Sequence, residues 1–220
     1  MQHEILAACL GHTGDIIPGG RSGFTVRPGV HFLSVSEQQA INRIARLGGF
    51  FSFLERFASD GGAASFSHGI GDDGGSDKDR GLYLRALQYG VQSLLDEFAS
   101  AVVALEREAM LDPTLPVSYI NGALREYQLV LPAVAAVCQR AVRERLRGAR
   151  ILELLHTSCQ SGMPAVRASV ERLTKCCLQV WYNQSVAWLL HGILMDPYEE
   201  YFVQRNGPEP SLQRRRLVPD

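Results

Sequence analysis

The chain has 220 residues, enough to bury a substantial hydrophobic core in one large domain or two smaller ones. Its net charge of −1 excludes a whole-chain electrostatic attraction to nucleic acid or to an anionic membrane surface. No apolar stretch approaches the roughly 20 residues that span a bilayer, and the start lacks the basic region of a signal peptide. We therefore expect a soluble, cytosolic protein.

The N-terminal part combines irregular segments with one well-marked helix. Residues 11–29 contain Gly-Gly and Arg-Pro-Gly turn signals and a weak strand pattern at 24–26. The sequence Ser34-Val35-Ser36-Glu37 has the form of a capping box, which predicts that a helix begins there. Residues 60–79, rich in Gly, Asp and Ser, predict a flexible loop. The apolar positions of the expected helix are Ile41, Ile44, Leu47 and Phe51.

Three further stretches have the spacing of amphipathic helices. From about 80 to 110, apolar residues recur at steps of three and four and form one stripe. A second stripe runs from 120 to 138, where Ser118 is the expected N-cap and Pro132 is expected to kink or divide the helix. A third begins just after Pro164. The stripes contain Leu84, Leu87, Val91, Leu94, Phe98, Ala101 and Leu105, then Ile120, Leu124, Tyr127, Leu131, Val134 and Cys138, then Val166, Val170, Leu173, Cys177 and Val180.

The sequence beyond Tyr182 predicts a buried helix followed by a rigid corner. Apolar residues from 186 to 194 surround the helix axis, so we expect this helix to be central and mostly buried. Asp196, Pro197 and Glu199 have the pattern of an N-cap, a first-turn proline and a capping-box glutamate of a short aromatic helix.

The elements together predict an all-α fold, an elongated stack of helical bundles with mostly antiparallel neighbours. The predicted helical domain covers residues 1–205, with the flexible loop at 60–79. The prolines and arginines of residues 206–220 predict a disordered tail.

No nucleotide or metal site is predicted from the sequence motifs. The glycine-rich residues 11–14 and 19–23 lack the lysine of a P-loop, so turns are the expected structure. His156 and Cys159 could share a helix face, but a structural zinc site needs four ligands and no second pair is suitably spaced. We therefore expect no cofactor and no metal.

Catalysis is not predicted either. Cys138 and Cys177 lie on apolar stripes, where a free thiol behaves as a small hydrophobic group. His191 lies in the most apolar stretch, which favours a core histidine hydrogen-bonded to a neighbour. No local nucleophile signature accompanies these residues, so we expect a protein that is not an enzyme.

Basic residues gather in one short stretch, Arg140, Arg143, Arg145, Arg147 and Arg150, with Glu144 as the acid among them. Such a cluster could contact an acidic partner surface. The favoured interpretation is a solvated helix end, where cations interact well with the helix dipole.

The segment from Gln184 to Val203 resembles the diagnostic segment of the gamma-tubulin complex components, the Spc97/Spc98 family. It contains Trp188-Leu189-Leu190-His191-Gly192 and Asp196-Pro197-Tyr198, and it departs mildly where Tyr201 replaces a commoner Phe. The stretches 151–156 and 162–167 also fit this family. The start of the chain, at His3-Glu4-Ile5-Leu6, resembles a family member that begins almost directly with the shared N-terminal domain.

The resemblance implies a structural role. Family members have two helical domains, of which the N-terminal one makes lateral contacts between neighbouring components of the gamma-tubulin ring complex. The C-terminal domain binds gamma-tubulin, and the ring templates microtubule nucleation. This chain corresponds to the N-terminal domain, so the expected partners are other gamma-tubulin complex components, with gamma-tubulin contacted only indirectly.

The expected location is the cytoplasm and the cytoskeleton, at microtubule organising centres such as the centrosome and the spindle pole. Neither nucleic acid nor a membrane is an expected partner. The sequence alone leaves open a second function, a generic helical adaptor that binds an amphipathic helix of a regulatory partner. It does not assign the residues that would contact any partner.

Overall fold

The computed structural model describes residues 2–20, 23–27, 34–59, 81–112 and 114–203. The predicted loop at 60–79 and the predicted tail at 206–220 lie outside these residues. Within the described ranges, the helices are α1 (Gln2–Cys9), α2 (Val35–Ser59), α3 (Leu82–Leu111), α4 (Val117–Ala123), α5 (Tyr127–Arg143), α6 (Ala149–Ser158) and α7 (Pro164–His191). Two short strands, β1 (Gly19–Gly20) and β2 (Gly23–Phe24), pair antiparallel in the irregular N-terminal region.

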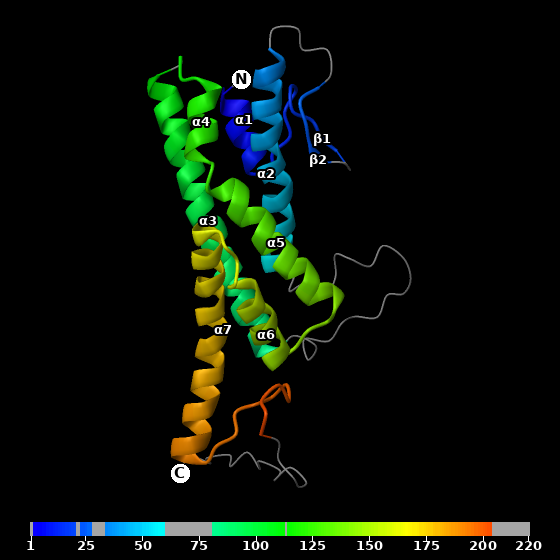
Figure 1. The fold of residues 1–220 in the computed structure, drawn as a ribbon, viewed down its shortest axis with the longest axis vertical. Helices are drawn as coiled ribbons and strands as arrows, with labels where there is room; N and C mark the ends of the chain where they lie inside the picture. Colours follow the sequence, from blue (N-terminus) through cyan, green and yellow to red (C-terminus); the bar gives the residue numbers. More distant parts are fainter. Residues whose placement is uncertain (1, 21–22, 28–33, 60–80, 113, 204–220) are drawn as a thin grey trace, which may run out of the picture.

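The helices form an elongated body in which most long neighbours run antiparallel (Figure 1). Helix α3 runs back along α2, and α7 runs back along α3. Two contacts show that α7 runs antiparallel to α3. Gly90 lies against Leu173, and the Tyr83 hydroxyl donates to Gln184 Oε1 at 3.0 Å. Helix α5 crosses α2, and α1 runs parallel to α2. The prediction of an all-α fold is confirmed.

The start of α2 confirms the predicted capping box. Ser34 Oγ accepts a hydrogen bond from the Glu37 amide at 3.3 Å, and Glu37 Oε2 accepts one from the Ser34 amide at 2.9 Å. These reciprocal bonds pair amides that the first helical turn leaves without partners. The same bonds from Ser34 lower the pKa of the Glu37 carboxyl, because they favour its charged form.

The predicted stripe of α3 is largely buried and forms the middle of the core. Leu87, Val91 and Phe98 have no exposed surface, whereas Leu84 and Ala101 at the edges of the stripe are half-buried. Phe98 contacts Tyr127 edge-on, with ring centroids 5.0 Å apart, and Phe51 with ring centroids 5.9 Å apart. The core therefore joins α2, α3 and α5 through one aromatic residue.

The helix is not divided at Pro132. The chain breaks at residues 124–126, between α4 and α5, and Pro132 lies inside α5. Asn121 and Gly122 precede the break and are weak helix formers. The expected N-cap, Ser118, is also wrong, because α4 begins at Val117 with proline at the N-cap position.

Helices α1 and α2 approach each other closely at Gly48. A Cβ atom at this position would overlap the backbone carbonyl oxygen of Ala8. A backbone atom cannot move aside as a flexible side chain can, so any larger residue separates the two helices. The neighbouring Gly49 has no atom within 4 Å of its Cβ position.

These two glycines provide a matched test of the α1–α2 contact. We expect Gly48→Ala to destabilise the protein by about 1–3 kcal/mol through overpacking. Gly49→Ala should stabilise it by about 0.5–1 kcal/mol, because alanine is the better helix former. Urea unfolding followed by circular dichroism measures both. Equal effects of the two substitutions would contradict the packing.

A candidate interaction surface at the end of helix α7

The last turns of α7 extend past the ends of α3 and α6 (Figure 1). Their side chains are exposed: Leu189 by 69% and Leu190 by 74%. The prediction that this part of α7 is central and mostly buried is therefore wrong. Because α3 begins at Leu82, it offers no packing surface beyond the level of Gln184.

Three of the exposed apolar residues of α7 occupy one face. Leu178, Tyr182 and Leu189 are separated by four and seven residues, so they line up on the helix. The buried residues Cys177 and Gln184 lie on a different face, toward α3. We call Leu178, Tyr182 and Leu189 the α7 stripe.

Two further features make the α7 stripe a candidate contact surface. No Asp, Glu, Lys or Arg occurs between Cys176 and Met195, so no formal acidic or basic side chain breaks it up. Ile193 and Met195, just beyond the helix, are also exposed. Contiguous exposed apolar surface on a folded domain is characteristic of protein contacts. No helix in the described part of the chain is long and apolar enough to cross a membrane.

Helix α7 ends at a left-handed glycine. Gly192 has φ 64°, and its amide donates to the Trp188 carbonyl at 3.0 Å. The Ile193 amide donates to the Ala187 carbonyl at 3.1 Å, which completes a Schellman-type ending. His191, in the last turn, is exposed, so the prediction of a core histidine is wrong.

The chain then turns back without forming the predicted second helix. Asp196 Oδ2 accepts a hydrogen bond from the Tyr201 amide at 2.6 Å, across a turn rather than within a first helical turn. Glu199 is exposed, with φ 55°, and does not occupy a third helical position. Asp196 as an N-cap and Glu199 as its capping-box partner are both wrong.

Glu200 holds this returning segment against two helix starts. Its Oε1 atom accepts a hydrogen bond from the Gly148 amide at 3.1 Å, and its Oε2 atom faces the Tyr83 amide at 3.5 Å. Gly148 precedes α6 and Tyr83 lies in the first turn of α3, where no side-chain cap is present. A carboxylate is favoured there by the free amides and by both helix dipoles.

Glycines leave room on both sides of the Glu200 carboxylate. A Cβ atom at Gly81 would overlap that carboxylate, and one at Gly148 would lie 2.7 Å from the Glu200 carbonyl oxygen. Gly148 also has φ 54°, which disfavours other residues. The two glycines therefore provide the space that Glu200 fills.

A buried polar pair joins the returning segment to α7. The Ser185 and Tyr201 hydroxyls are 2.9 Å apart, and Tyr201 is 3% exposed. The Tyr201 ring also packs edge-on against Trp188, with ring centroids 6.5 Å apart. The segment that the sequence marks as diagnostic thus consists of the end of α7 and a turn that folds back on it, held by the Ser185–Tyr201 and Asp196–Tyr201 contacts.

The cysteines and histidines do not form a reactive centre in the described residues. Burial raises the pKa of the Cys9 and Cys177 thiols to about 12, and it raises that of Cys138 further, as expected of core thiols. The Cys159 thiol contacts the Thr174 hydroxyl at 3.5 Å, and His156 is exposed. No group of His, Cys, Asp and Glu in the described ranges is arranged to hold a metal ion.

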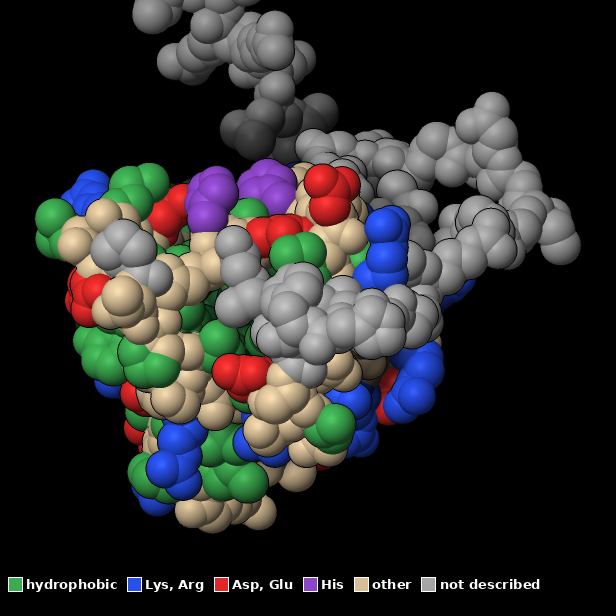
Figure 2. All heavy atoms as spheres, turned by 90° about the horizontal axis from the view of Figure 1, so that it is seen from above, with side chains coloured by type: hydrophobic (Ala, Val, Ile, Leu, Met, Phe, Trp, Pro, Cys, Tyr) green, Lys and Arg blue, Asp and Glu red, His purple; other side chains and the backbone are tan. Residues whose placement is uncertain are grey.

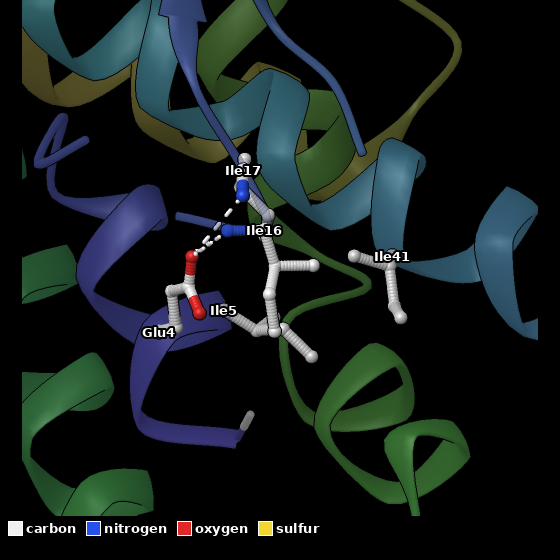
Figure 3. Close-up of a pocket in the computed structure, with 5 residues that line it drawn as sticks. All are labelled: Glu4, Ile5, Ile16, Ile17 and Ile41. Carbon is white, nitrogen blue, oxygen red and sulfur yellow. Dashed lines mark hydrogen bonds between the residues drawn. The ribbon is translucent and has the colours of Figure 1, made fainter. Parts of the chain in front are cut away.

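A small depression beside α1 is occupied by internal contacts (Figure 3). It is lined by Glu4, Ile5, Ile16, Ile17 and Ile41. Glu4 Oε1 accepts hydrogen bonds from the Ile16 amide at 2.5 Å and the Ile17 amide at 3.1 Å. The carboxylate thus pins the irregular segment to α1, and the depression has no room for a water molecule.

The opposite end of the molecule has a different character. Figure 2 shows hydrophobic side chains there interspersed with acidic, basic and histidine side chains. Met110 and Leu111 are exposed at the end of α3, where α3 and α4 meet. His3 Nδ1 lies 2.5 Å from Glu106 Oε1 nearby. The visible face therefore mixes charge with apolar surface, unlike the α7 stripe.

Comparison with known proteins places this fold in a family of assembly subunits. The family described as "Gamma tubulin complex component N-terminal" matches residues 3–216. The chain therefore belongs to the gamma-tubulin complex component family, as its N-terminal domain.

Individual relatives show which types of family member the chain is similar to. The chain is 34% identical to the mouse gamma-tubulin complex component 4 over 225 residues, which cover 100% of this chain and 33% of the relative. It is 35% identical to the human component 4 over 213 residues, covering 94% of this chain and 31% of the relative. Component 2 of Arabidopsis thaliana matches at 28% over 142 residues, covering 64% and 20%. The chain spans about a third of the length of the component 4 relatives.

The Glu200 contacts can be tested with a matched pair of variants. Glu200→Gln replaces one acceptor oxygen by an amide donor that faces a backbone amide, so we expect a loss of roughly 1–3 kcal/mol. Glu199→Gln makes the same chemical change at an exposed site and should stay within about 0.5 kcal/mol of the parent protein. Urea unfolding measures both, and equal losses would contradict the assigned contacts.

The buried hydroxyl of Tyr83 predicts a dependence of stability on alkaline pH. Burial, followed by the negative charge of Glu200, raises its pKa to about 12, against about 10 for an unfolded tyrosine. The folded state favours the neutral form, so this contribution is complete below about pH 10 and is lost as the pH rises toward 12.

The matching variant is Tyr83→Phe, which removes the titrating hydroxyl. We expect the parent protein to be the more stable at neutral pH, and the difference between the two to shrink as the pH rises from about 10 to about 12. Urea unfolding at a series of pH values measures the difference. A difference that stays constant with pH would contradict the prediction.

Proposed function

We propose that this chain is a non-catalytic scaffold module that makes lateral contacts between neighbouring components of gamma-tubulin complexes and so supports microtubule nucleation. Membership of the family supports an assembly role, since the relatives are named as components of that complex. Its partners would be other gamma-tubulin complex components, with gamma-tubulin contacted indirectly. Its location would be cytoplasmic and cytoskeletal, at microtubule organising centres such as centrosomes and spindle poles.

The observation that supports a contact role most directly is the α7 stripe. Leu178, Tyr182 and Leu189 are exposed by 42%, 59% and 69% on a helix held in place by α3 and by the Glu200 turn. Placing another protein on this face removes apolar area from water at little cost in ordering, because the helix is already formed. Long packed helices also suit an assembly whose function depends on fixed spacing.

The proposal predicts that other gamma-tubulin complex components bind the full 220-residue chain through the α7 stripe. We expect the triple variant Leu178→Gln, Tyr182→Gln and Leu189→Gln to lose most of this binding in a pull-down with the purified components. Because each replaced side chain is exposed, the variant should remain folded by circular dichroism.

A control changes three exposed apolar residues in the C-terminal part of α3. The variant Val103→Gln, Met110→Gln and Leu111→Gln should bind the components as the parent chain does. If the folded parent chain binds none of them, the scaffold role is wrong. If both triple variants bind equally well, the α7 stripe is not the contact.

The generic adaptor remains the alternative, because an exposed apolar helix face also suits an amphipathic helix of a regulatory protein. The pull-down separates the two functions. Binding to gamma-tubulin complex components supports the scaffold, whereas binding only to isolated amphipathic helices, with no complex component retained, supports the adaptor.

A further inference from the structure

The turn between α5 and α6 presents a basic surface that the proposed function does not use. Every arginine from 140 to 150 is exposed, and the acidic residue among them is Glu144. Glu144 Oε1 lies 2.9 Å from Arg140 Nε and 3.9 Å from an Arg143 Nη atom, so part of the charge is compensated locally. The stretch nevertheless keeps a net charge of +4. We call Arg140, Arg143, Arg145, Arg147 and Arg150 the arginine turn.

The backbone of the arginine turn is held on both sides. The Leu146 amide donates to the Ala141 carbonyl at 2.9 Å, and the Leu146 side chain packs against the core. Gly148, next in the turn, donates its amide to Glu200. Arg145 is itself held at φ 47°, which a residue with a side chain rarely adopts. The guanidinium groups therefore project from a fixed frame.

The distribution of charge points to the chemistry of a partner. Since the whole chain has a net charge of −1 and residues 140–150 carry +4, the rest of the sequence carries −5. A long polyanion, such as a nucleic acid or an anionic membrane, would have to approach that acidic remainder as well. A short acidic segment can contact the arginine turn alone.

The residue type also favours carboxylate groups. A guanidinium group presents a rigid fork of N–H donors that matches a carboxylate with two parallel bonds. A fixed frame lowers the ordering cost of such pairing. We propose that the arginine turn is a docking site for an extended segment rich in Asp and Glu of a partner protein, distinct from the α7 stripe.

The proposal can be tested with the full chain and a defined probe, a synthetic peptide of alternating Glu and Ser carrying a fluorophore. We expect fluorescence anisotropy to show binding that weakens as salt is raised. The variant Arg143→Gln, Arg145→Gln and Arg150→Gln should lower the affinity at least about tenfold, the sum of three exposed ion pairs. The α7 stripe variant should bind the peptide as the parent does.

A second set of arginines serves as the control. Arg43, Arg46 and Arg107 are exposed on α2 and α3, and changing all three to Gln removes the same charge. This variant should keep the affinity within about twofold of the parent. An equal loss in both variants would mean that net charge alone drives binding and would overturn the proposal. Absence of peptide binding by the folded parent chain would overturn it as well.

The nature of the partner is tested by two further probes at the same salt concentration. These are a single-stranded DNA oligonucleotide and vesicles that contain an anionic lipid. We expect both to bind more weakly than the peptide. Tighter binding of either one would overturn the assignment to an acidic protein segment.

Discussion

The packing of α7 along α3 is the contact on which the rest of this structure depends. Leu173 lies so close to Gly90 that a Cβ atom there would be 2.8 Å from the leucine side chain. That approach brings the Cys177 thiol to the Tyr83 carbonyl and Gln184 to the Tyr83 hydroxyl. Because α3 also contacts α1 and α2, it transmits the position of α7 to most of the core.

The same contact explains why the molecule has an apolar end. Helix α7 packs along α3 only as far as Gln184. The turns beyond Gln184 pack on one side against Tyr201. Their remaining apolar side chains, Leu189 and Leu190 among them, stay exposed. A surface of this kind suits a subunit of a larger assembly, since a chain that acted alone would gain stability by covering it.

Glu200 connects this apolar end to the arginine turn. One carboxylate oxygen faces the start of α3 and the other accepts the Gly148 amide, beside Arg147 and Arg150. The carboxylate thus attaches the segment that returns from α7 to the backbone of the turn that carries the arginines. The segment that returns from α7 and the turn between α5 and α6 are thus tied to the same carboxylate.

The sequence by itself determined α2, α3 and α7, most of their buried stripes and the capping box at Ser34, because each depends on residues a few positions apart. It also marked the diagnostic segment from Gln184 to Val203, although not its conformation. The tertiary structure decided that Leu189 and Leu190 are exposed, since apolar character is the same whether a neighbouring helix continues or ends. It also decided that Glu200, rather than Glu199, holds the turn. That choice depends on amides at Tyr83 and Gly148, which are distant in sequence and adjacent only after folding.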